Sequence, residues 1–226
     1  MPASEIDARR PGMLWVRNLD WPLPENIAPR VPATFRCIGP EEIESLARVM
    51  RLDDLATIEQ RFAAGKRCYA AQVDGALATY GWVSFEEEEI GEIRLRIHLM
   101  PGEAYIWDCS TAPSYRRKRL YTTLLLHMVD QLRAEGLCRV WIGTDGDNVA
   151  SQQGIALAGF RPVADLLVTR VIGIRRFWVR GRDGIPESIV SDARRALLGD
   201  RDQVWLAALS AVQRDVARSA RGHTLA

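Results

Sequence analysis

Residues 105–121 read Tyr-Ile-Trp-Asp-Cys-Ser-Thr-Ala-Pro-Ser-Tyr-Arg-Arg-Lys-Arg-Leu-Tyr, and this stretch decides the fold. Its first part, Tyr105–Thr111, has the apolar and β-prone composition of a strand. Helical periodicity then runs over Arg119–Glu135 and ends at a glycine. A helix N-terminus offers unpaired backbone N–H groups, and the cations Arg116–Arg119 add full charges. The stretch predicts a strand, a loop and a helix whose loop can hold a pyrophosphate, although four cations are also common in a solvated turn.

Further strand patterns lie on both sides of this unit. Arg67–Val73 and Leu77–Phe85, joined at Asp74-Gly75, predict a hairpin. Upstream, two helices are expected, one opening at Pro40 and one over Leu55–Ala64; downstream, strand patterns cover Arg139–Gly143 and Val163–Val179, with a short helix at Asn148–Leu157. Whether Val163–Val179 forms one bent strand or two stays open. The order predicts an α/β fold with a mixed, mostly antiparallel sheet flanked by helices and one crossover between parallel strands.

The chain divides into three parts. Residues 1–34 are rich in proline and predict an irregular N-terminal arm. Residues 35–182 carry the patterns of one domain. Residues 183–226 predict a C-terminal helical extension that is a packed appendage, a cap on a substrate site or an element of a homodimer. Its apolar stripe, which needs a partner surface, consists of Trp205, Leu209, Val212 and Val216.

Composition excludes several classes of protein. The 226 residues include 30 Lys+Arg and 29 Asp+Glu, for a net charge of +1, and 47% are hydrophobic. Such a balance argues against a nucleic-acid partner and against disorder. No apolar run approaches the roughly 20 residues of a membrane span, and the polar Met1–Pro11 lacks the apolar centre of a signal peptide. We therefore expect no membrane partner.

The cysteines are too far apart for a metal site. None forms a CxxC pair or lies near a histidine cluster, so no bound metal is expected. Each occupies an apolar stretch, which predicts buried, reduced thiols in a cytoplasmic protein. The four are Cys37, Cys68, Cys109 and Cys138.

The cationic loop resembles the acyl-CoA binding motif of the GNAT N-acetyltransferase superfamily. In that family a strand leads through Pro-x-Tyr-Arg into an Arg/Gln-x-x-Gly-x-Gly/Ala loop that opens a helix. Here Thr111–Arg116 matches the approach and Arg116 the first loop position. Arg119 stands at the first glycine and Tyr121 at the last Gly/Ala.

A second motif of the same family lies downstream. Asn148 stands eleven residues before Gly159, which Phe160 follows, and Ser151 holds the family's usual small-residue position. Together the two motifs give a resemblance that covers roughly Phe35–Val179.

The resemblance implies that the strand before the loop splays from its parallel neighbour and that an acyl-CoA, most simply acetyl-CoA, is the co-substrate. The pantetheine arm would pair with the backbone of Cys109, Ser110 and Thr111. Asn148 would bond to that arm or to the backbone near it. The pyrophosphate would be held by the amides of Arg117, Lys118, Arg119, Leu120, Tyr121 and Thr122, with Arg116 closing the turn.

This sequence departs from the family pattern at three positions. Arg119 replaces a glycine that tolerates unusual dihedral angles, but it supplies a charge-assisted donor. Tyr121 is a milder change, because its ring can turn aside. Many members place a tyrosine seven residues after the asparagine to protonate the departing thiolate, and here that position is Ile155. Acid catalysis must come from another group, from water, or not at all.

Two acidic residues of the Tyr105–Thr111 strand region are candidates for the general base. Asp108 interrupts an apolar strand, where burial would raise its pKa; the alternative is an ion pair with a neighbouring arginine such as Arg94 or Arg96. Glu103 is the second candidate, or a residue of a Pro-Gly-Glu turn. The period of two places Glu103, Tyr105 and Trp107 on one face, and Asp108 on the other.

The remaining charged residues have simpler interpretations. His98 and His127 are expected to be structural or surface residues. Glu86–Glu89 predicts a solvated hairpin tip, or else an acidic rim that attracts a cationic amine.

Three functions fit these observations. The first is an acyl-CoA-dependent N-acetyltransferase that acts on a primary amine of a small molecule or peptide by direct attack in a ternary complex. The second is a non-catalytic GNAT-like module that binds acyl-CoA or serves as a scaffold, which the changes at Arg119 and Ile155 favour. A third, with an aminoacyl-tRNA donor, is disfavoured by the near-neutral charge.

Overall fold

The computed structural model describes residues 12–90, 95–171 and 174–199. In this part of the chain, eight strands form one sheet in the order β10-β9-β1-β8-β7-β4-β3-β2, and two more form a separate ribbon, β5-β6. The strands are β1 (Gly12–Asn18), β2 (Thr34–Ile38), β3 (Arg67–Val73), β4 (Ala76–Ser84), β5 (Glu87–Ile90), β6 (Leu95–His98), β7 (Glu103–Thr111), β8 (Arg139–Asp145), β9 (Arg161–Val171) and β10 (Ile174–Gly181). The α-helices are α1 (Ile43–Met50), α2 (Leu55–Ala63), α3 (Leu120–Ala134), α4 (Val149–Leu157) and α5 (Glu187–Leu198).

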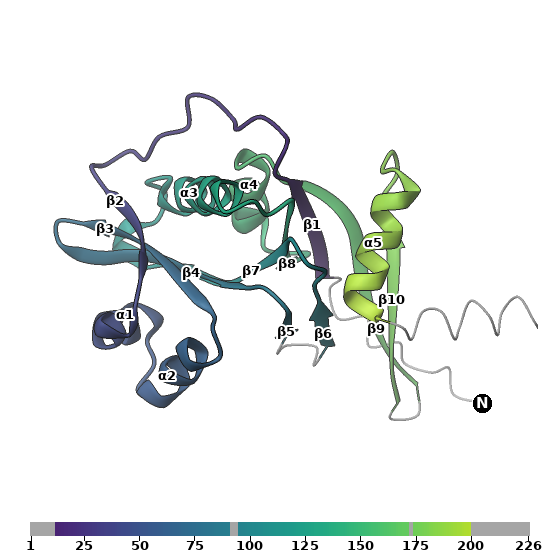
Figure 1. The fold of residues 1–226 in the computed structure, drawn as a ribbon, viewed down its shortest axis with the longest axis horizontal. Coiled ribbons are helices and arrows are strands. Elements are labelled where there is room, and N and C mark those ends of the chain that lie inside the picture. The colour runs from purple at the N-terminus through teal and green to yellow at the C-terminus, as the bar shows by residue number, and fades with distance from the viewer. Residues whose placement is uncertain (1–11, 91–94, 172–173, 200–226) are drawn as a thin grey trace, which may run out of the picture.

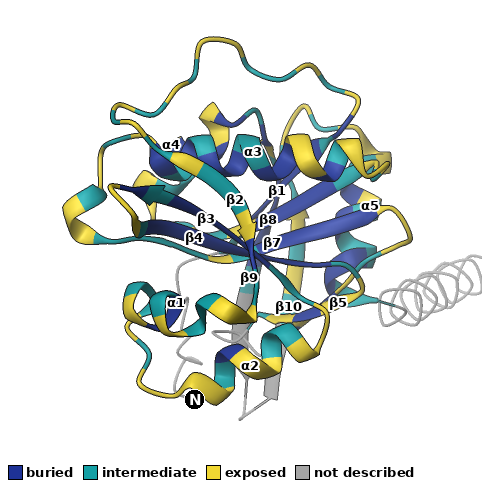
Figure 2. Ribbon diagram, turned by 60° about the vertical axis from the view of Figure 1, so that its left-hand side comes forward, coloured by how far each residue is buried: buried dark blue, intermediate teal, exposed yellow. Residues whose placement is uncertain are grey.

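Helices cover both faces of the sheet (Figure 1). α3 and α4 lie on one face, and α1 and α2 lie on the other, while α5 lies beside β9 and β10. Each helix turns its buried side toward the sheet (Figure 2). The core is divided accordingly, with Leu124 and Met128 of α3 on one face and Leu46 and Trp82 on the other, all fully buried.

The predicted fold class is confirmed. β3 and β4 form the expected hairpin, in which Asp74 and Gly75 have the positive φ values, 50° and 80°, of a two-residue turn. β7 and β8 are parallel and are connected through α3, as a crossover requires. Every other strand pair in the described part of the chain is antiparallel. The pattern over Val163–Val179 forms two strands, β9 and β10.

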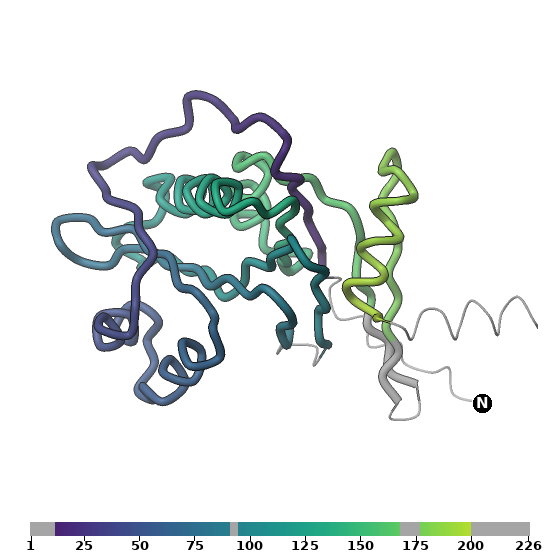
Figure 3. Tube along the Cα trace, viewed as in Figure 1, coloured from purple at the N-terminus to yellow at the C-terminus, as the bar shows by residue number. Residues whose placement is uncertain are grey.

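The prediction of an irregular N-terminal arm is wrong for residues 12–18. These residues form β1, which lies inside the sheet and pairs antiparallel with β8 on one side and β9 on the other. Leu14, Trp15 and Val16 are at most 5% exposed. The short apolar run that drives this burial lies between prolines, which hid it in the sequence. Residues 19–33 then pass over α3 to reach β2 (Figure 3).

The C-terminal extension begins as predicted but joins the main core. α5 packs on β6, β9 and β10, and it buries Val190, Ala193, Ala196 and Leu197. The predicted stripe from Trp205 to Val216 lies outside the described residues.

The prediction of four buried cysteines holds for one and fails for two. Cys68 is buried and Cys109 is half-buried, whereas Cys37 and Cys138 are exposed, and all four are free. Cys37 lies on the edge strand β2, and Cys138 lies in the loop before β8, where apolar neighbours in sequence do not cover the side chain. Among the described residues, no helix has the length and apolar character needed to cross a membrane.

Candidate active site where β7 and β8 part

Strands β7 and β8 separate halfway along β7. Their parallel pairing covers Glu103–Ile106 with Arg139–Ile142 and goes no further, although β7 continues to Thr111 and β8 to Asp145. The other edge of β7 stays paired with β4 as far as Thr111. In the described structure, the edge of Trp107–Thr111 that faces β8 therefore has no strand partner. Cys109, Ser110 and Thr111, for which the family resemblance implies pairing with the pantetheine arm, belong to this segment, and an open strand edge can pair with an extended ligand through its backbone N–H and C=O groups.

A β-bulge lies at the point of separation. Tyr80 pairs with Ser110 and Trp82 with Trp107, so that Asp108 and Cys109 both lie opposite Gly81. Asp108 has a φ of 41°, in the left-handed region. A side chain at Gly81 would place its Cβ 2.6 Å from Sγ of Cys109, so glycine there leaves room for the Cys109 side chain.

The cationic loop leads directly into α3. Arg117 and Arg119 have φ values of 62° and 59°, and Arg119 is the N-terminal capping residue of α3. The first backbone bond into the helix runs from N of Thr123 to O of Arg119, at 3.1 Å. The N–H groups of the three preceding residues, Leu120–Thr122, have no helical partner and can bind an anion.

The loop is held in place at both ends. Nε of Arg116 lies 3.3 Å from O of Thr111, which closes the loop on the end of β7. Arg30 approaches from the N-terminal segment, where its N donates to O of Lys118 at 2.9 Å and its Nη1 to O of Arg117 at 3.3 Å. Arg30 thus adds a fifth cation. Sequence reasoning missed it, because the contact joins residues 87 positions apart.

Tyr121 fills the space between α3 and α4. Its hydroxyl lies 3.3 Å from Oγ of Ser151, and a Cβ at Gly154 would be 2.7 Å from its ring. The large ring at position 121, where the family has Gly or Ala, therefore fits because residue 154 is a glycine. Burial raises the pKa of Tyr121, so the phenol is protonated at neutral pH.

Two positions of the family motif, Asn148 and Ile155, lie at the start of α4 and within it. Asn148 is the N-cap, and its Oδ1 accepts from N of Ser151 at 3.1 Å. Ile155 is fully buried in the part of the core that α3 covers, and its hydrocarbon side chain has no proton that it could donate.

Asp108 faces α2, and within the described residues it pairs with Arg61 and not with Arg96. Oδ2 lies 2.5 Å from Nη1 of Arg61, and Oδ1 accepts from the hydroxyl of Tyr80 at 3.1 Å. Arg96 instead pairs with Glu87 at 3.0 Å, and Arg94 lies outside the described residues. The Asp108 side chain is 31% exposed, so the expected burial is incomplete.

The predicted alternation of β7 side chains fails at the bulge. Arg61 contacts Asp108 and also stacks over Trp107, with Cζ 4.6 Å from the ring centroid. Asp108 and Trp107 therefore lie on the same face, because the bulge shifts the period of two by one residue.

Glu103 lies at the opposite end of β7 and does not reach this site. It is 5% exposed and accepts from N of Met100 at 3.0 Å, from Arg139 at 3.2 Å and from Arg195 at 3.3 Å. These bonds join β7, β8 and α5. The surroundings of Glu103 are those of a structural carboxylate.

A cluster of aromatic and charged residues surrounds Asp108 on the α2 face. The rings of Trp82 and Trp107 lie 6.1 Å apart, and Cζ of Arg61 is 5.2 Å from the centroid of Trp82. Nζ of Lys66 lies 4.8 Å from the centroid of Trp107. Sequence reasoning missed Arg61, Lys66 and Trp82, which come from three separate segments.

A chain of polar contacts fixes the ring of Trp107. Its Nε1 donates to Oγ of Ser84 at 2.9 Å, and that hydroxyl donates to Oε2 of Glu88 at 2.5 Å. Lys66 pairs with the same Glu88 oxygen at 2.6 Å. Glu88 is 6% exposed, so the prediction of a solvated tip over Glu86–Glu89 is wrong at this position, where β5 turns the carboxylate inward.

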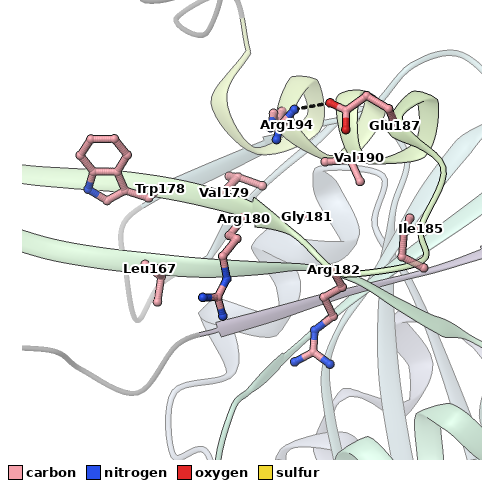
Figure 4. Close-up of a pocket in the computed structure, with 10 residues that line it drawn as sticks. All are labelled: Leu167, Trp178, Val179, Arg180, Gly181, Arg182, Ile185, Glu187, Val190 and Arg194. Carbon is pink, nitrogen blue, oxygen red and sulfur yellow. Dashed lines mark hydrogen bonds and ion pairs between the residues drawn. The ribbon is translucent and has the colours of Figure 1, made fainter.

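Two surface hollows lie away from this site. One, of about 500 Å³, is lined by β10 and α5, where Arg194 pairs with Glu187 (Figure 4). Another, of about 730 Å³, lies at α1 and the start of α2. Neither contains a site residue expected from the sequence. The described residues also include no cluster of acidic, histidine or cysteine side chains that could hold a metal ion.

Comparison with known proteins identifies the family. The profile of the Acetyltransferase (GNAT) family matches residues 37–160, more than half of the chain. The chain therefore belongs to the GNAT acetyltransferase family, whose members use acyl-CoA. The resemblance seen in the sequence is confirmed. Among curated proteins, none matches this chain.

Several solved structures have a similar fold. A GNAT-family acetyltransferase from Colwellia psychrerythraea is 16% identical, with a TM-score of 0.49, over 68% of this chain and 53% of its own length. This chain thus spans about half of that protein. The ribosomal-protein-S18-alanine N-acetyltransferase from Escherichia coli is 14% identical, with a TM-score of 0.49, over 69% of this chain and 99% of its own length. An aminoglycoside N-acetyltransferase in complex with CoA is 17% identical, with a TM-score of 0.46, over 66% of this chain and 99% of its own length.

Proposed function

We propose that this protein is an acyl-CoA-dependent N-acyltransferase that transfers an acetyl group from acetyl-CoA to a primary amine. The separation of β7 from β8 carries the proposal. Within the described residues, it leaves the edge of Trp107–Thr111 that faces β8 without a strand partner, and β7 then leads to a loop of cations and a helix N-terminus. An extended amide chain attached to a pyrophosphate, which is the chemistry of CoA, fits such an arrangement.

The catalytic step requires an amine without its extra proton. In the proposed reaction, an N–H proton of the substrate ammonium passes to the carboxylate of Asp108, directly or through water. The amine nitrogen then forms a bond with the thioester carbon, and the carbon–sulfur bond breaks. The nitrogen releases a second proton, and the thiolate takes one up to leave as CoA-SH. Asp108 lies at the bulge, directly before Cys109, the first of the three residues proposed to pair with pantetheine.

The donor is tested first, by calorimetric titration with acetyl-CoA and by thiol release with a panel of amines. Failure to bind any acyl-CoA would refute the proposal.

The base is tested by two variants that separate the candidates. We expect Asp108→Asn to retain its fold and acetyl-CoA binding but to lose most of kcat, by about a hundredfold or more. We expect Glu103→Gln to lose stability, because it weakens a buried ionic network, and to keep kcat in the folded fraction. The reverse pattern would assign the base to Glu103.

A second candidate function is a non-catalytic acyl-CoA-binding or scaffolding module. Ile155 at the usual acid position and Arg119 at the usual glycine favour it. Tight acetyl-CoA binding without turnover on a broad amine panel would support this candidate, and turnover abolished by Asp108→Asn would exclude it.

A further inference from the structure

The α2 face of the bulge presents one cation and one anion side by side. Nη1 of Arg61 and Oδ2 of Asp108 lie 2.5 Å apart, next to the ring of Trp107. Their side chains are 19% and 31% exposed, so a ligand can approach both. α2 and α3 lie on opposite faces of the sheet (Figure 1). The N-terminus of α3 is the part of the proposed CoA site that would bind the pyrophosphate.

Both charged groups keep unused hydrogen-bonding capacity. A guanidinium has five N–H donors, and within the described residues the hydrogen bond shown for Arg61 uses Nη1 alone. The carboxylate of Asp108 accepts from Arg61 and from Tyr80, which is two of about four bonds that it can accept. A ligand can therefore bind to the remaining edge of each group without breaking the pair.

We propose that the acceptor is a free α-amino acid in its zwitterionic form. Its carboxylate binds the open edge of the Arg61 guanidinium, and its ammonium group binds Asp108 and passes a proton to it. An α-amino acid carries both charges on one carbon, which matches a cation and an anion held in contact. This inference rests on the proposed function, because it names the amine of that same reaction.

The surrounding residues indicate which side chain the amino acid carries. The ring of Trp107 is fixed by Ser84 and has Arg61 and Lys66 over it, but Trp107 is only half-buried, so part of it stays open to a ligand beside the ion pair. An apolar or aromatic amino-acid side chain can pack on it. Polyamines and other polycations are disfavoured, because Arg61 and Lys66 would both repel them.

The test compares acceptors that differ in one charge. With saturating acetyl-CoA, thiol release is measured for phenylalanine and leucine, for their C-terminal amides, and for spermidine. The amide keeps the amine and loses the carboxylate. Its amine is also less basic, which alone would favour the amide. We expect kcat/KM for each amino acid to exceed that of its amide by about ten- to a hundredfold, as a charged hydrogen-bonded pair predicts.

Arg61 is tested against a matched arginine. Arg61→Gln also removes the partner of Asp108 and so affects every amine, but it should raise KM for the amino acids more than for their amides and reduce the preference over the amides to about unity. Arg67→Gln is the control, because Arg67 also stacks on an aromatic ring, Phe85, and pairs with a carboxylate, Glu135, but belongs to neither proposed site. It should leave the preference unchanged. Far-ultraviolet circular dichroism and thermal unfolding check that both variants fold.

The possible failures are distinguishable. Acetyl-CoA binding with no turnover of any amine would overturn the proposed function and this inference together. Turnover of spermidine or of the amides at least as fast as of the amino acids would overturn the inference alone. An amino-acid preference that survives Arg61→Gln would also overturn it, because the carboxylate would then bind elsewhere.

Discussion

Arg119 combines a strained backbone with a useful charge. Its φ of 59° costs a non-glycine residue roughly 1 kcal/mol. Arg119→Gly removes the strain and the guanidinium, whereas Arg119→Ala removes the guanidinium alone. We expect both variants to bind acetyl-CoA less tightly, and the glycine variant to unfold with a free energy about 1 kcal/mol higher than the alanine variant. Calorimetric titration and urea unfolding measure the two effects. Equal stability of the two variants would contradict the strain.

Gly81 provides the room in which the β7 bulge forms. An added methyl group would lie 2.6 Å from Sγ of Cys109 and 2.9 Å from Cε of Met128. We expect Gly81→Ala to lower the free energy of unfolding by about 1–3 kcal/mol, because the neighbours must move. Cys109→Ala provides the control: the double variant should lose less than the sum of the two single losses, as for residues in contact. Strict additivity would show that Cys109 does not limit the space.

At this scale, the sequence was informative where function depends on neighbours along the chain. The cationic loop and Asp108 were both predicted from one continuous stretch. Arg30, Arg61 and Lys66 were not, because tertiary packing brings them to the site from distant segments. The face occupied by Asp108 was predicted wrongly, because a bulge breaks the alternation on which the prediction depends.

At the scale of elements, the packing of α3 on β2 and β3 includes a titratable group. His127 lies with its ring 6.1 Å from those of Phe35 and Tyr69. Burial lowers the pKa of His127 from 6.5, and nearby Asp130 opposes the shift only in part. The unfolded chain thus binds a proton more readily than the folded chain. Stability should therefore fall as the pH drops below about 6.5 toward the lowered pKa.

The His127→Phe variant isolates this contribution. Phenylalanine keeps an aromatic ring against Phe35 and Tyr69 and cannot be protonated. We expect the free energy of unfolding in urea, measured at pH 8 and at pH 5.5, to fall less in the variant than in the wild type. An identical pH dependence in the two proteins would show that His127 titrates alike in the folded and unfolded states.

Regular elements were predictable where their pattern is long, and two short strands were not. α3 has 15 residues with a clear apolar period, and its limits agree with the sequence to within a residue. β5 was missed, because its four residues include three glutamates, which have a low strand propensity. The side chain of Glu88 points inward, where it pairs with Lys66. β1 was missed because its apolar run is short and its partners, β8 and β9, follow more than a hundred residues later.

At the scale of the whole molecule, the sheet separates the two substrates of the proposed reaction. The cationic loop and α3 serve the CoA face, and α2 with the ring of Trp107 serves the acceptor face. The bulge in β7 is the place where the two faces meet, since Asp108 projects toward α2 while Cys109 packs on the α3 side. β8, which borders the opening, is itself held in the sheet by β1. Residues near the N-terminus thus support the position of a site more than ninety residues away.

This dependence predicts a large effect of a change in β1. Val16 is fully buried between β8 and β9, and Val16→Asp would place a carboxylate among Leu14, Trp141 and Ala164. A buried, unpaired charge costs on the order of 4 kcal/mol or more, a large part of the 5–15 kcal/mol that stabilises an ordinary domain. We expect the variant to lose most of its free energy of unfolding in urea and, because β8 loses its neighbour, its affinity for acetyl-CoA as well. Ala28→Asp adds the same charge at an exposed position of the segment that follows β1 and should leave the free energy of unfolding unchanged. If Val16→Asp were as stable as Ala28→Asp, β1 could not lie inside the sheet, and residues 12–18 would have to belong to the irregular arm that the surrounding prolines first indicated.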